Sequence, residues 1–319
     1  MKEYGGYIEL ETNHGKEYYE NLVRLNCGRA CLAYLIESQK IRKILLPFFV
    51  CNAVRQTCEK YGVEYESYFI DENFFPKFNG NLNNDEVYIY VVNHYSQLDK
   101  QYLVKLKEKY HNIIIDNVCA FFEEPIYGCD TIYSCRKYFG VPDGAYLSTN
   151  ATVQKKYPVD ISYGRMYFLL GRFEKTASEF YTEYVRNNEL FRNEPIKNMS
   201  KLTLNLLKGI DYELVKEKRG RNFQYLHKRL GNRNNLTLKT TVGPYAYPFM
   251  VENGHVLRQK LQENKIYIPM LWPEVLKLVP ENTLEYKFAN DILPLPVDQR
   301  YGKEDMEYIC DIIERSGIC

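Results

Sequence analysis

The sequence predicts an α/β fold: a mostly parallel central sheet sandwiched between helices, followed by a smaller C-terminal α+β domain. Short apolar runs alternate with helical patterns of about ten residues in the first half, as in βαβ units. From Ala151 onward, long helical stretches dominate. The chain has 319 residues, more than one core usually supports. The expected division is an N-terminal arm at 1–14, a large α/β domain at 15–200 and a smaller domain at 201–319.

In the first half, apolar runs bounded by turn residues predict the strands, and amphipathic spacing predicts the helices. The expected strands are 41–46, 63–70, 87–92, 113–115 and 131–133. The expected helices are 15–25, a helix opening at Gly28, 52–61 and 100–110. A polar loop is expected at 79–85. Because the strands are joined by helices, their carboxyl ends should meet at one edge of the sheet, where α/β proteins bind ligands.

The second half of the sequence shows a different pattern of expected elements. Residues 155–190 and 202–230 are expected to form two long helices, the second with a charged, solvated face. Short strands are expected at 236–240, 247–251, 266–268 and 292–296, and helices at 255–264 and 304–315.

Composition excludes several functional classes. Lys and Arg number 42 against 41 Asp and Glu, a net charge of +1, so neither nucleic acid nor an anionic membrane is an expected partner. No apolar run approaches the length of a bilayer span, and the N-terminus lacks the apolar core of a signal peptide, so a cytosolic protein is expected. The nine cysteines contain no CxxC pair and the five histidines lie far apart, so neither a zinc site nor a disulfide framework is expected.

Three polar residues follow two of the expected strands. Asp116 ends the run Ile113–Ile115, Ser134 ends the next run, and Lys137 follows three residues later. Pyridoxal phosphate requires a lysine amine for a Schiff base, a carboxylate beside its pyridine nitrogen and donors for its phosphate, which these residues match. The alternative is that Asp116 caps a turn, Ser134 ends a strand and Lys137 is a surface lysine.

A glycine turn in the first quarter of the chain supplies a candidate phosphate site. Cys27-Gly28-Arg29 opens a helix, and backbone N–H groups at such a helix start can approach an anion. Glycine precedes many helices, so this turn supports a phosphate site only when it is taken together with the lysine and the carboxylate.

In its order of motifs the chain resembles the DegT/DnrJ/EryC1/StrS family, sugar aminotransferases of the fold type I pyridoxal-phosphate enzymes. The family's Ser-Gly-Thr-Ala-Ala-Leu turn is similar to residues 27–32, and its proline-led segment to LPFFVCNAV at 46–54. Its Asp-Ala-Ala-Gln-Ala strand end is similar to residues 116–120. Its Lys-x-x-Gly and Asp-Gly-Gly motifs are similar to 137–140 and 143–145, and its tail to residues 293–313.

The resemblance implies a role for each matched position. Lys137 would carry the Schiff base and shuttle a proton, and Asp116 would pair with the pyridinium nitrogen. Ser134 and the turn Gly28, Arg29 and Ala30 would hold the phosphate. Asn198 would reach that phosphate from the partner subunit of a homodimer with shared active sites. Asn93, which ends another strand at the same edge, is a further candidate cofactor ligand.

The chain departs from the family's pattern at several of these positions. Cys51 occupies the place of the aromatic residue that stacks on the cofactor ring, with Phe48 or Phe49 as possible substitutes. Cys119 replaces a glutamine near the 3′ oxygen and is a much weaker hydrogen-bond partner. Arg29 replaces a threonine at the phosphate turn, where it could add a cation or point to solvent.

The expected function is therefore a pyridoxal-phosphate aminotransferase. It would move an amino group, from glutamate, to a keto group of a nucleotide-linked sugar or a similar small carbonyl compound, through the pyridoxamine form. The rival is a non-catalytic or altered-reaction homologue that acts as a binding or regulatory subunit. A dehydratase of the kind that replaces the lysine by histidine is disfavoured by Lys137.

Two further signals in the sequence have other interpretations. The spacing S-x-x-K at 134–137 also occurs in β-lactamases, but those need S-D-N and K-T-G motifs as well, and the chain has no S-D-N. His94, Tyr95 and Trp272 could line a substrate pocket, although such residues are more often partly buried aromatics.

Overall fold

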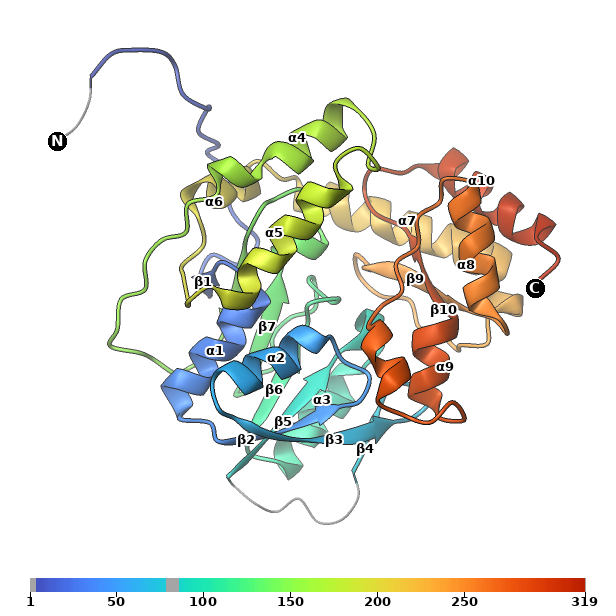
Figure 1. The fold of residues 1–319 in the computed structure, drawn as a ribbon, viewed down its shortest axis with the longest axis horizontal. Helices are drawn as coiled ribbons and strands as arrows, with labels where there is room; N and C mark the ends of the chain where they lie inside the picture. Colours follow the sequence, from blue (N-terminus) through green and yellow to red (C-terminus); the bar gives the residue numbers. More distant parts are fainter. Residues whose placement is uncertain (1–3, 79–85, 319) are drawn as a thin grey trace.

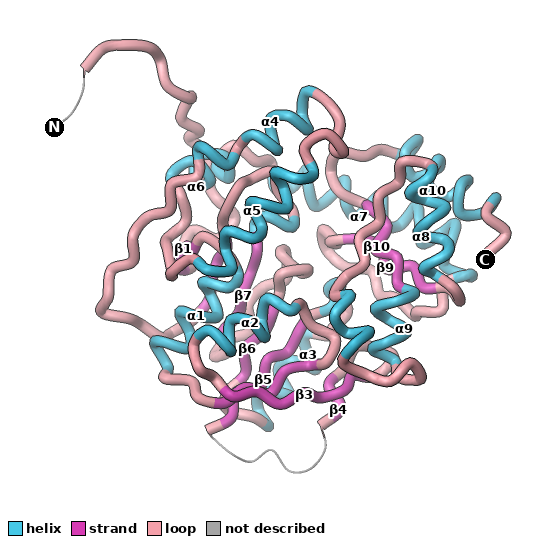
Figure 2. The backbone as a smooth tube through the Cα atoms, viewed as in Figure 1, coloured by secondary structure: helices cyan, strands magenta, loops and turns pink. Residues whose placement is uncertain are grey.

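A computed structural model describes residues 4–78 and 86–318, and its central feature is an eight-stranded sheet of order β1-β8-β7-β6-β5-β2-β3-β4 (Figures 1 and 2). The strands are β1 (Val23–Leu25), β2 (Lys43–Pro47), β3 (Glu64–Ile70), β4 (Pro76–Lys77), β5 (Val87–Val92), β6 (Ile113–Asp116), β7 (Asp130–Ser134) and β8 (Ala145–Ser148). The five neighbouring strands from β7 to β3 are parallel. β8 pairs antiparallel with β7 and with the edge strand β1, and β4 pairs antiparallel with β3 at the other edge. The predicted mostly parallel α/β sheet is confirmed.

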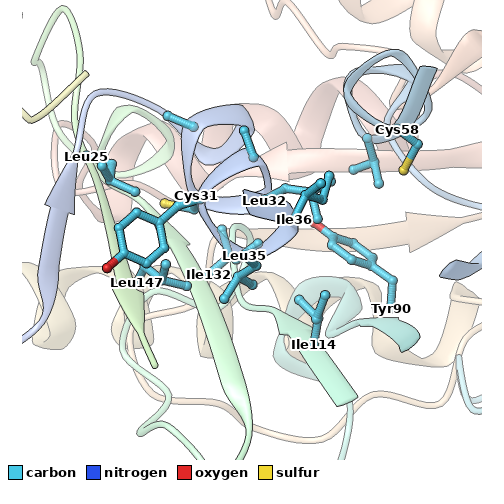
Figure 3. Packing of buried hydrophobic residues seen from close by; sticks show 14 of the residues in the cluster. Leu25, Cys31, Leu32, Leu35, Ile36, Cys58, Tyr90, Ile114, Ile132 and Leu147 are labelled. Atoms are coloured by element: carbon cyan, nitrogen blue, oxygen red, sulfur yellow. The ribbon is translucent and has the colours of Figure 1, made fainter. Parts of the chain in front are cut away.

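Helices cover both faces of the sheet, and the alternation of side chains along β6 shows how. Ile114 belongs to the core beneath α1 (Gly28–Gln39) and α2 (Asn52–Lys60), which includes Leu35 and Ile132 (Figure 3). Its neighbours Ile113 and Ile115 point to the other face, into a core shared with α3 (Lys100–Lys109) and α9 (Leu284–Asp291). Successive strand residues face opposite sides, so a run that is buried throughout requires a helix layer on each side.

The parallel arrangement gathers the expected strand ends at one edge. β2, β5, β6 and β7 are consecutive and parallel, so Pro47, Asn93, Asp116 and Ser134 all lie at their carboxyl ends. α1 and α2 both begin after residues at this edge, which places their N-termini there too.

The C-terminal part builds a second, two-stranded sheet of β9 (Ala246–Met250) and β10 (Ile292–Pro296), paired antiparallel. It packs with α7 (Tyr212–Leu230), α8 (Gly254–Glu263) and α10 (Lys303–Arg315) around a core of its own. The boundary between 200 and 201 stays a prediction, because buried contacts join α7 to the large sheet: Arg219 donates to the backbone oxygen of Tyr138 at 3.1 Å.

Three further helices lie between the two sheets in sequence: α4 (Tyr167–Glu174), α5 (Tyr181–Asn193) and α6 (Lys201–Lys208). Short 3₁₀ segments are η1 (His94–Ser96), η2 (Cys135–Lys137), η3 (Tyr163–Arg165), η4 (Gly231–Arg233) and η5 (Pro273–Lys277). In Figure 1, α4 and α5 lie next to each other on the outside of the molecule, and the described start of the chain projects away from the body.

Several expected elements are wrong. The stretch 155–190 is not one helix: Pro158 lacks an N–H, and the backbone of 158–160 instead bonds to Asn198, so helix resumes only at α4 and α5. The stretch 202–230 is two helices, because α6 ends at Gly209 and Asp211 caps α7 by accepting from the N–H of Leu214 at 3.0 Å. Residues 15–25 form β1 and turns, since β1 pairs with β8.

Two expected short strands are also absent. In 236–240 the backbone N–H groups bond to side chains, as when Gln97 accepts from Lys239 at 2.9 Å. In 266–268, Ile266 bonds back to Leu261. The loop expected at 79–85 lies outside the described residues. Within 4–78 and 86–318, no helix is both long and apolar enough to cross a bilayer, and no group of three His, Cys, Asp or Glu residues is arranged to hold a metal ion.

Candidate active site at the carboxyl edge of the sheet

Asp116 is the buried carboxylate of the candidate site. It ends β6 with 7% of its surface exposed. Its Oδ2 accepts from the Tyr90 hydroxyl at 2.8 Å and its Oδ1 from the N–H of Val118 at 2.9 Å. Burial raises the pKa of Asp116, while the Val118 N–H, the Tyr90 hydroxyl and the charge of Lys137 act to lower it. The fold therefore fixes this carboxylate rigidly beside a lysine.

Lys137 is the last residue of η2, directly after β7. Its side chain is exposed, and its Nζ lies 5.9 Å from the centre of the Tyr245 ring. The Tyr245 phenol raises the pKa of Lys137, against the effect of burial by surrounding side chains, with Cys119, Tyr184 and Cys51 acting in the same direction as Tyr245. An exposed amine with protein groups on several sides is the arrangement expected of a reactive lysine.

The start of α1 supplies free donors. The first helical bond joins the N–H of Cys31 to Cys27, and Cys27 makes no side-chain cap. No acidic residue lies in the first turn of α1. Among the described residues, none bonds to the Ser134 hydroxyl, nor to the buried Nε of Arg29. Gly28, Arg29, Ala30 and Ser134 thus leave donors available where the sequence predicts a phosphate.

Both cysteines that replace family residues lie near the lysine. Cys51 precedes α2 and is exposed, whereas Cys119 is buried, which raises its pKa to about 12. Both act electrostatically on Lys137. Asn93 lies at the same edge, but its side chain is engaged in structure: it donates to Asn117 at 3.1 Å and accepts from the N–H of Leu98 at 3.0 Å.

Asn198 forms structural contacts within its own chain. Its side chain donates to the backbone oxygen of Tyr157 at 2.9 Å, and its backbone forms isolated bridges with Leu25 and Val159. The role expected of Asn198 concerns a partner subunit, so it stays a prediction.

The two candidate ring partners differ in burial. Phe48 is half-buried and packs against Phe69, with ring centres 4.6 Å apart. Phe49 is fully buried and stacks on His94, with ring centres 5.0 Å apart. His94 is 1% exposed and its Nε2 lies 2.8 Å from the backbone oxygen of Phe49. Burial lowers the pKa of His94 to about 4. Trp272, which is half-buried, packs edge-on against both rings.

Sequence reasoning missed several residues that border the site. Tyr90 was detectable: it lies two positions before Val92, which pairs with Asp116, and therefore shares its face. Tyr245 and Tyr184 come from distant segments without a motif. Arg136 lies between Ser134 and Lys137, but no motif marks it, and a single arginine in a turn is usually a surface residue.

The fold of this chain is similar to that of several solved structures. No known protein-family model and no curated protein matches the sequence. A DegT DnrJ EryC1 StrS aminotransferase from Brucella abortus is similar with a TM-score of 0.64 and 15% identity, over 92% of this chain and 85% of that one. The sugar aminotransferase CalS13 from Micromonospora echinospora gives 0.62 and 11%, over 93% and 87%.

A third similar structure was solved with a cofactor. It is NtdA from Bacillus subtilis with bound PMP, with a TM-score of 0.65 and 12% identity, over 92% of this chain and 72% of that one. Identities this low establish shared architecture and leave activity to be argued from the site. The chain has the fold of the DegT/DnrJ/EryC1/StrS aminotransferase structures.

Proposed function

We propose that the protein is a pyridoxal-phosphate-dependent aminotransferase. The observation that carries the proposal is the juxtaposition, at one sheet edge, of an exposed lysine amine, a buried carboxylate and an uncapped helix start. In the proposed assignment these are Lys137, Asp116 and the first turn of α1. Without a ligand, the buried carboxylate costs desolvation free energy, and the free N–H groups at the helix start lack hydrogen-bond acceptors.

The residues present fit the cofactor. Ser134 and the amides of Gly28 to Ala30 would hold its phosphate, and Asp116 would face the ring nitrogen. A Cβ on Gly28 would make ordinary contacts of 3.7 and 3.8 Å with Val118 and Ile132, so the protein's own packing does not require glycine there. We interpret this glycine as keeping the approach to the helix start open for a ligand.

When bound, pyridoxal phosphate supplies an aldehyde that condenses with amines and a ring that withdraws electrons from the adjoining carbon. The Nζ of Lys137 would hold the cofactor in place and then carry a proton between the amino donor and the cofactor. Asp116 would keep the ring nitrogen protonated, and Tyr90 and the Val118 N–H would keep Asp116 ionised and oriented. Tyr245 would help to orient the amine.

We further propose that the amino acceptor is a keto group of a nucleotide-linked sugar or a similar small carbonyl compound, and that glutamate is the donor. Support comes from the shared fold with structures named as sugar aminotransferases, CalS13 among them. This step rests on analogy of fold, which carries less weight than the site.

We also propose a homodimer with shared active sites. On α4 and the turn before it, Tyr163, Tyr167, Leu170 and Phe173 recur at helical spacing and are 58–91% exposed. An outward apolar stripe of this kind is typical of a covered surface. It borders the site, because a Cβ on Gly140 would lie 3.9 Å from Leu169 of α4. A second copy packed there would flank Lys137.

The test is single-turnover transfer. The cofactor-loaded protein is mixed with L-glutamate without a keto acceptor, and 2-oxoglutarate is quantified. The proposal predicts close to one 2-oxoglutarate per active site and no product with Lys137→Ala. The exposed-lysine variant Lys156→Ala should behave as the wild type. Failure of every common amino acid to yield its keto acid would exclude an aminotransferase and favour the non-catalytic homologue.

A further inference from the structure

Three arginines converge beside the start of α1, around the ring of Phe191. The Arg136 guanidinium lies 4.6 Å from the ring centre and that of Arg165 lies 5.2 Å from it. Arg29, from the first turn of α1, lines a pocket together with Phe191, Asn26 and Cys27. Phe191 itself is 2% exposed. Residues from four separate segments thus form one cluster of positive charge around a buried aromatic ring.

Not every guanidinium nitrogen of this cluster forms a hydrogen bond within the described residues. The Nε of Arg29, the Nε of Arg136 and Nη1 of Arg165 are buried and have no hydrogen-bond partner among the described residues. Buried polar groups are nearly always hydrogen-bonded, so three orphaned nitrogens on adjacent arginines point to a missing acceptor.

The charges are also unbalanced. Arg165 pairs with Asp160 at 2.6 Å, and Lys197 pairs with Glu194 at 2.8 Å. Arg29 and Arg136 form no ion pair within 4–78 and 86–318; Arg136 donates to the neutral Asn188. Burial lowers the pKa of Arg136, and the cationic Arg29 and Arg165 lower it further. Two positive charges therefore remain without a counter-ion.

We propose that Arg29, Arg136 and Arg165, with the first turn of α1, form a guanidinium cage for a phosphate monoester, namely the phosphate of the cofactor. This rests on the proposed function. A phosphate monoester carries about −1.5 to −2 charges at neutral pH, which matches the two uncompensated cations. Guanidinium groups also present paired donors to phosphate oxygens. In this cage, Arg29 would bring a cation to the position at the helix start where the family has a threonine hydroxyl.

The test compares pyridoxal phosphate with pyridoxal, which lacks the phosphate. Binding is measured by calorimetry in the full chain carrying Lys137→Ala, so that covalent attachment does not mask affinity. The cage predicts that Arg29→Gln or Arg136→Gln weakens pyridoxal phosphate about tenfold to a hundredfold, the loss of a charge-assisted hydrogen bond. Pyridoxal binding should be unchanged. Arg186→Gln, an exposed arginine on α5, is the matched control.

The same variants separate this inference from the proposed function. If pyridoxal phosphate binds and both arginine variants bind it as tightly as their parent, the cage is overturned while the function stands. If the protein binds neither form of the cofactor, thermal unfolding with inorganic phosphate, at matched ionic strength, decides. Stabilisation that is lost in Arg136→Gln, with a native circular dichroism spectrum, supports an anion site; no stabilisation of the wild type overturns it.

Discussion

At the scale of single residues, Asp116 is a carboxylate in a buried position, where the ionised form is disfavoured. Two hydrogen bonds hold the carboxylate, but burial still raises its pKa above the 3.8 of an exposed aspartate. The folded protein therefore binds this proton more tightly than the unfolded chain does. The stabilising contribution of Asp116 is full below pH 3.8 and is lost as pH rises through the folded-state pKa.

Asp116→Asn should therefore stabilise the cofactor-free protein at pH 7. Asparagine is neutral, keeps an acceptor for the Val118 N–H and can donate to the Tyr90 oxygen. We expect the melting temperature to rise by about 2 °C or more, the effect of roughly 1 kcal/mol in a medium-sized domain. The gain should shrink as the pH falls toward 3.8.

Differential scanning fluorimetry across this pH range measures the effect, with the exposed Glu307→Gln as control. A variant that melts below the wild type at pH 7 would show that ionised Asp116 stabilises the apo fold, and would remove the argument that its charge is retained for a ligand.

What the sequence revealed at this scale depended on local pattern. Asp116, Ser134 and Lys137 each follow a strand within a short window, so their meeting followed from parallel pairing alone. Tyr245 reaches the site from a loop and Arg165 from the short 3₁₀ segment η3, where little in the local sequence fixes the path of the chain. His94 is 1% exposed, which favours a core residue over a ligand-binding one.

At the scale of elements, the turn after Lys137 is tied to the start of α6. Asp143 is fully buried and accepts from the N–H of Ser200 at 2.8 Å, from its hydroxyl at 2.7 Å and from the Thr203 hydroxyl. Gly144 follows with φ 113°, and a Cβ there would lie 2.9 Å from Thr203. The Asp-Gly pair therefore joins the turn after Lys137 to the start of α6.

Asp143→Ala should destabilise the fold strongly. It leaves three buried donors without their charged acceptor, a loss of roughly 3 kcal/mol or more. Asp99→Ala is the control, because Asp99 caps α3 at the surface by accepting from the N–H of Gln101, and such a cap contributes about 1 kcal/mol. Urea midpoints compare the two. Equal shifts would contradict the role assigned to Asp143.

Elements with strict apolar patterning were predictable and irregular ones were not. The strands at 87–92 and 292–296 coincide with β5 and β10, since each is a compact apolar run between turns. The stretch 155–190 failed because its aromatic spacing looked helical while Pro158 and Gly164 interrupt it. β1 and β8 were not predicted, because strands of only three and four residues carry little pattern.

At the scale of the whole molecule, the C-terminal part completes the site. Tyr245 comes from the loop before β9, and Arg219 of α7 and Gln299 both donate to the backbone oxygen of Tyr138, next to Lys137. The site therefore depends on both sheets, and an isolated 15–200 fragment would lack the groups that hold this turn.

The exposed stripe on α4 predicts association. Phe173→Glu places a charge on a side chain that is 91% exposed in one chain, and should shift a dimer toward monomers in sedimentation velocity. Tyr127→Glu is the control, because Tyr127 is 97% exposed in the loop between β6 and β7, at the opposite edge of the sheet. A wild type that sediments as a monomer at all concentrations would contradict the shared active site.

The most direct test of the central claim is the visible absorption spectrum of the protein with pyridoxal phosphate, for the wild type, Lys137→Ala and Lys156→Ala. The account predicts a visible band in the wild type and Lys156→Ala that is lost on adding glutamate, and no such band in Lys137→Ala. A wild type without a band, or a band that survives Lys137→Ala, would contradict the assignment of Lys137 as the cofactor-bearing residue.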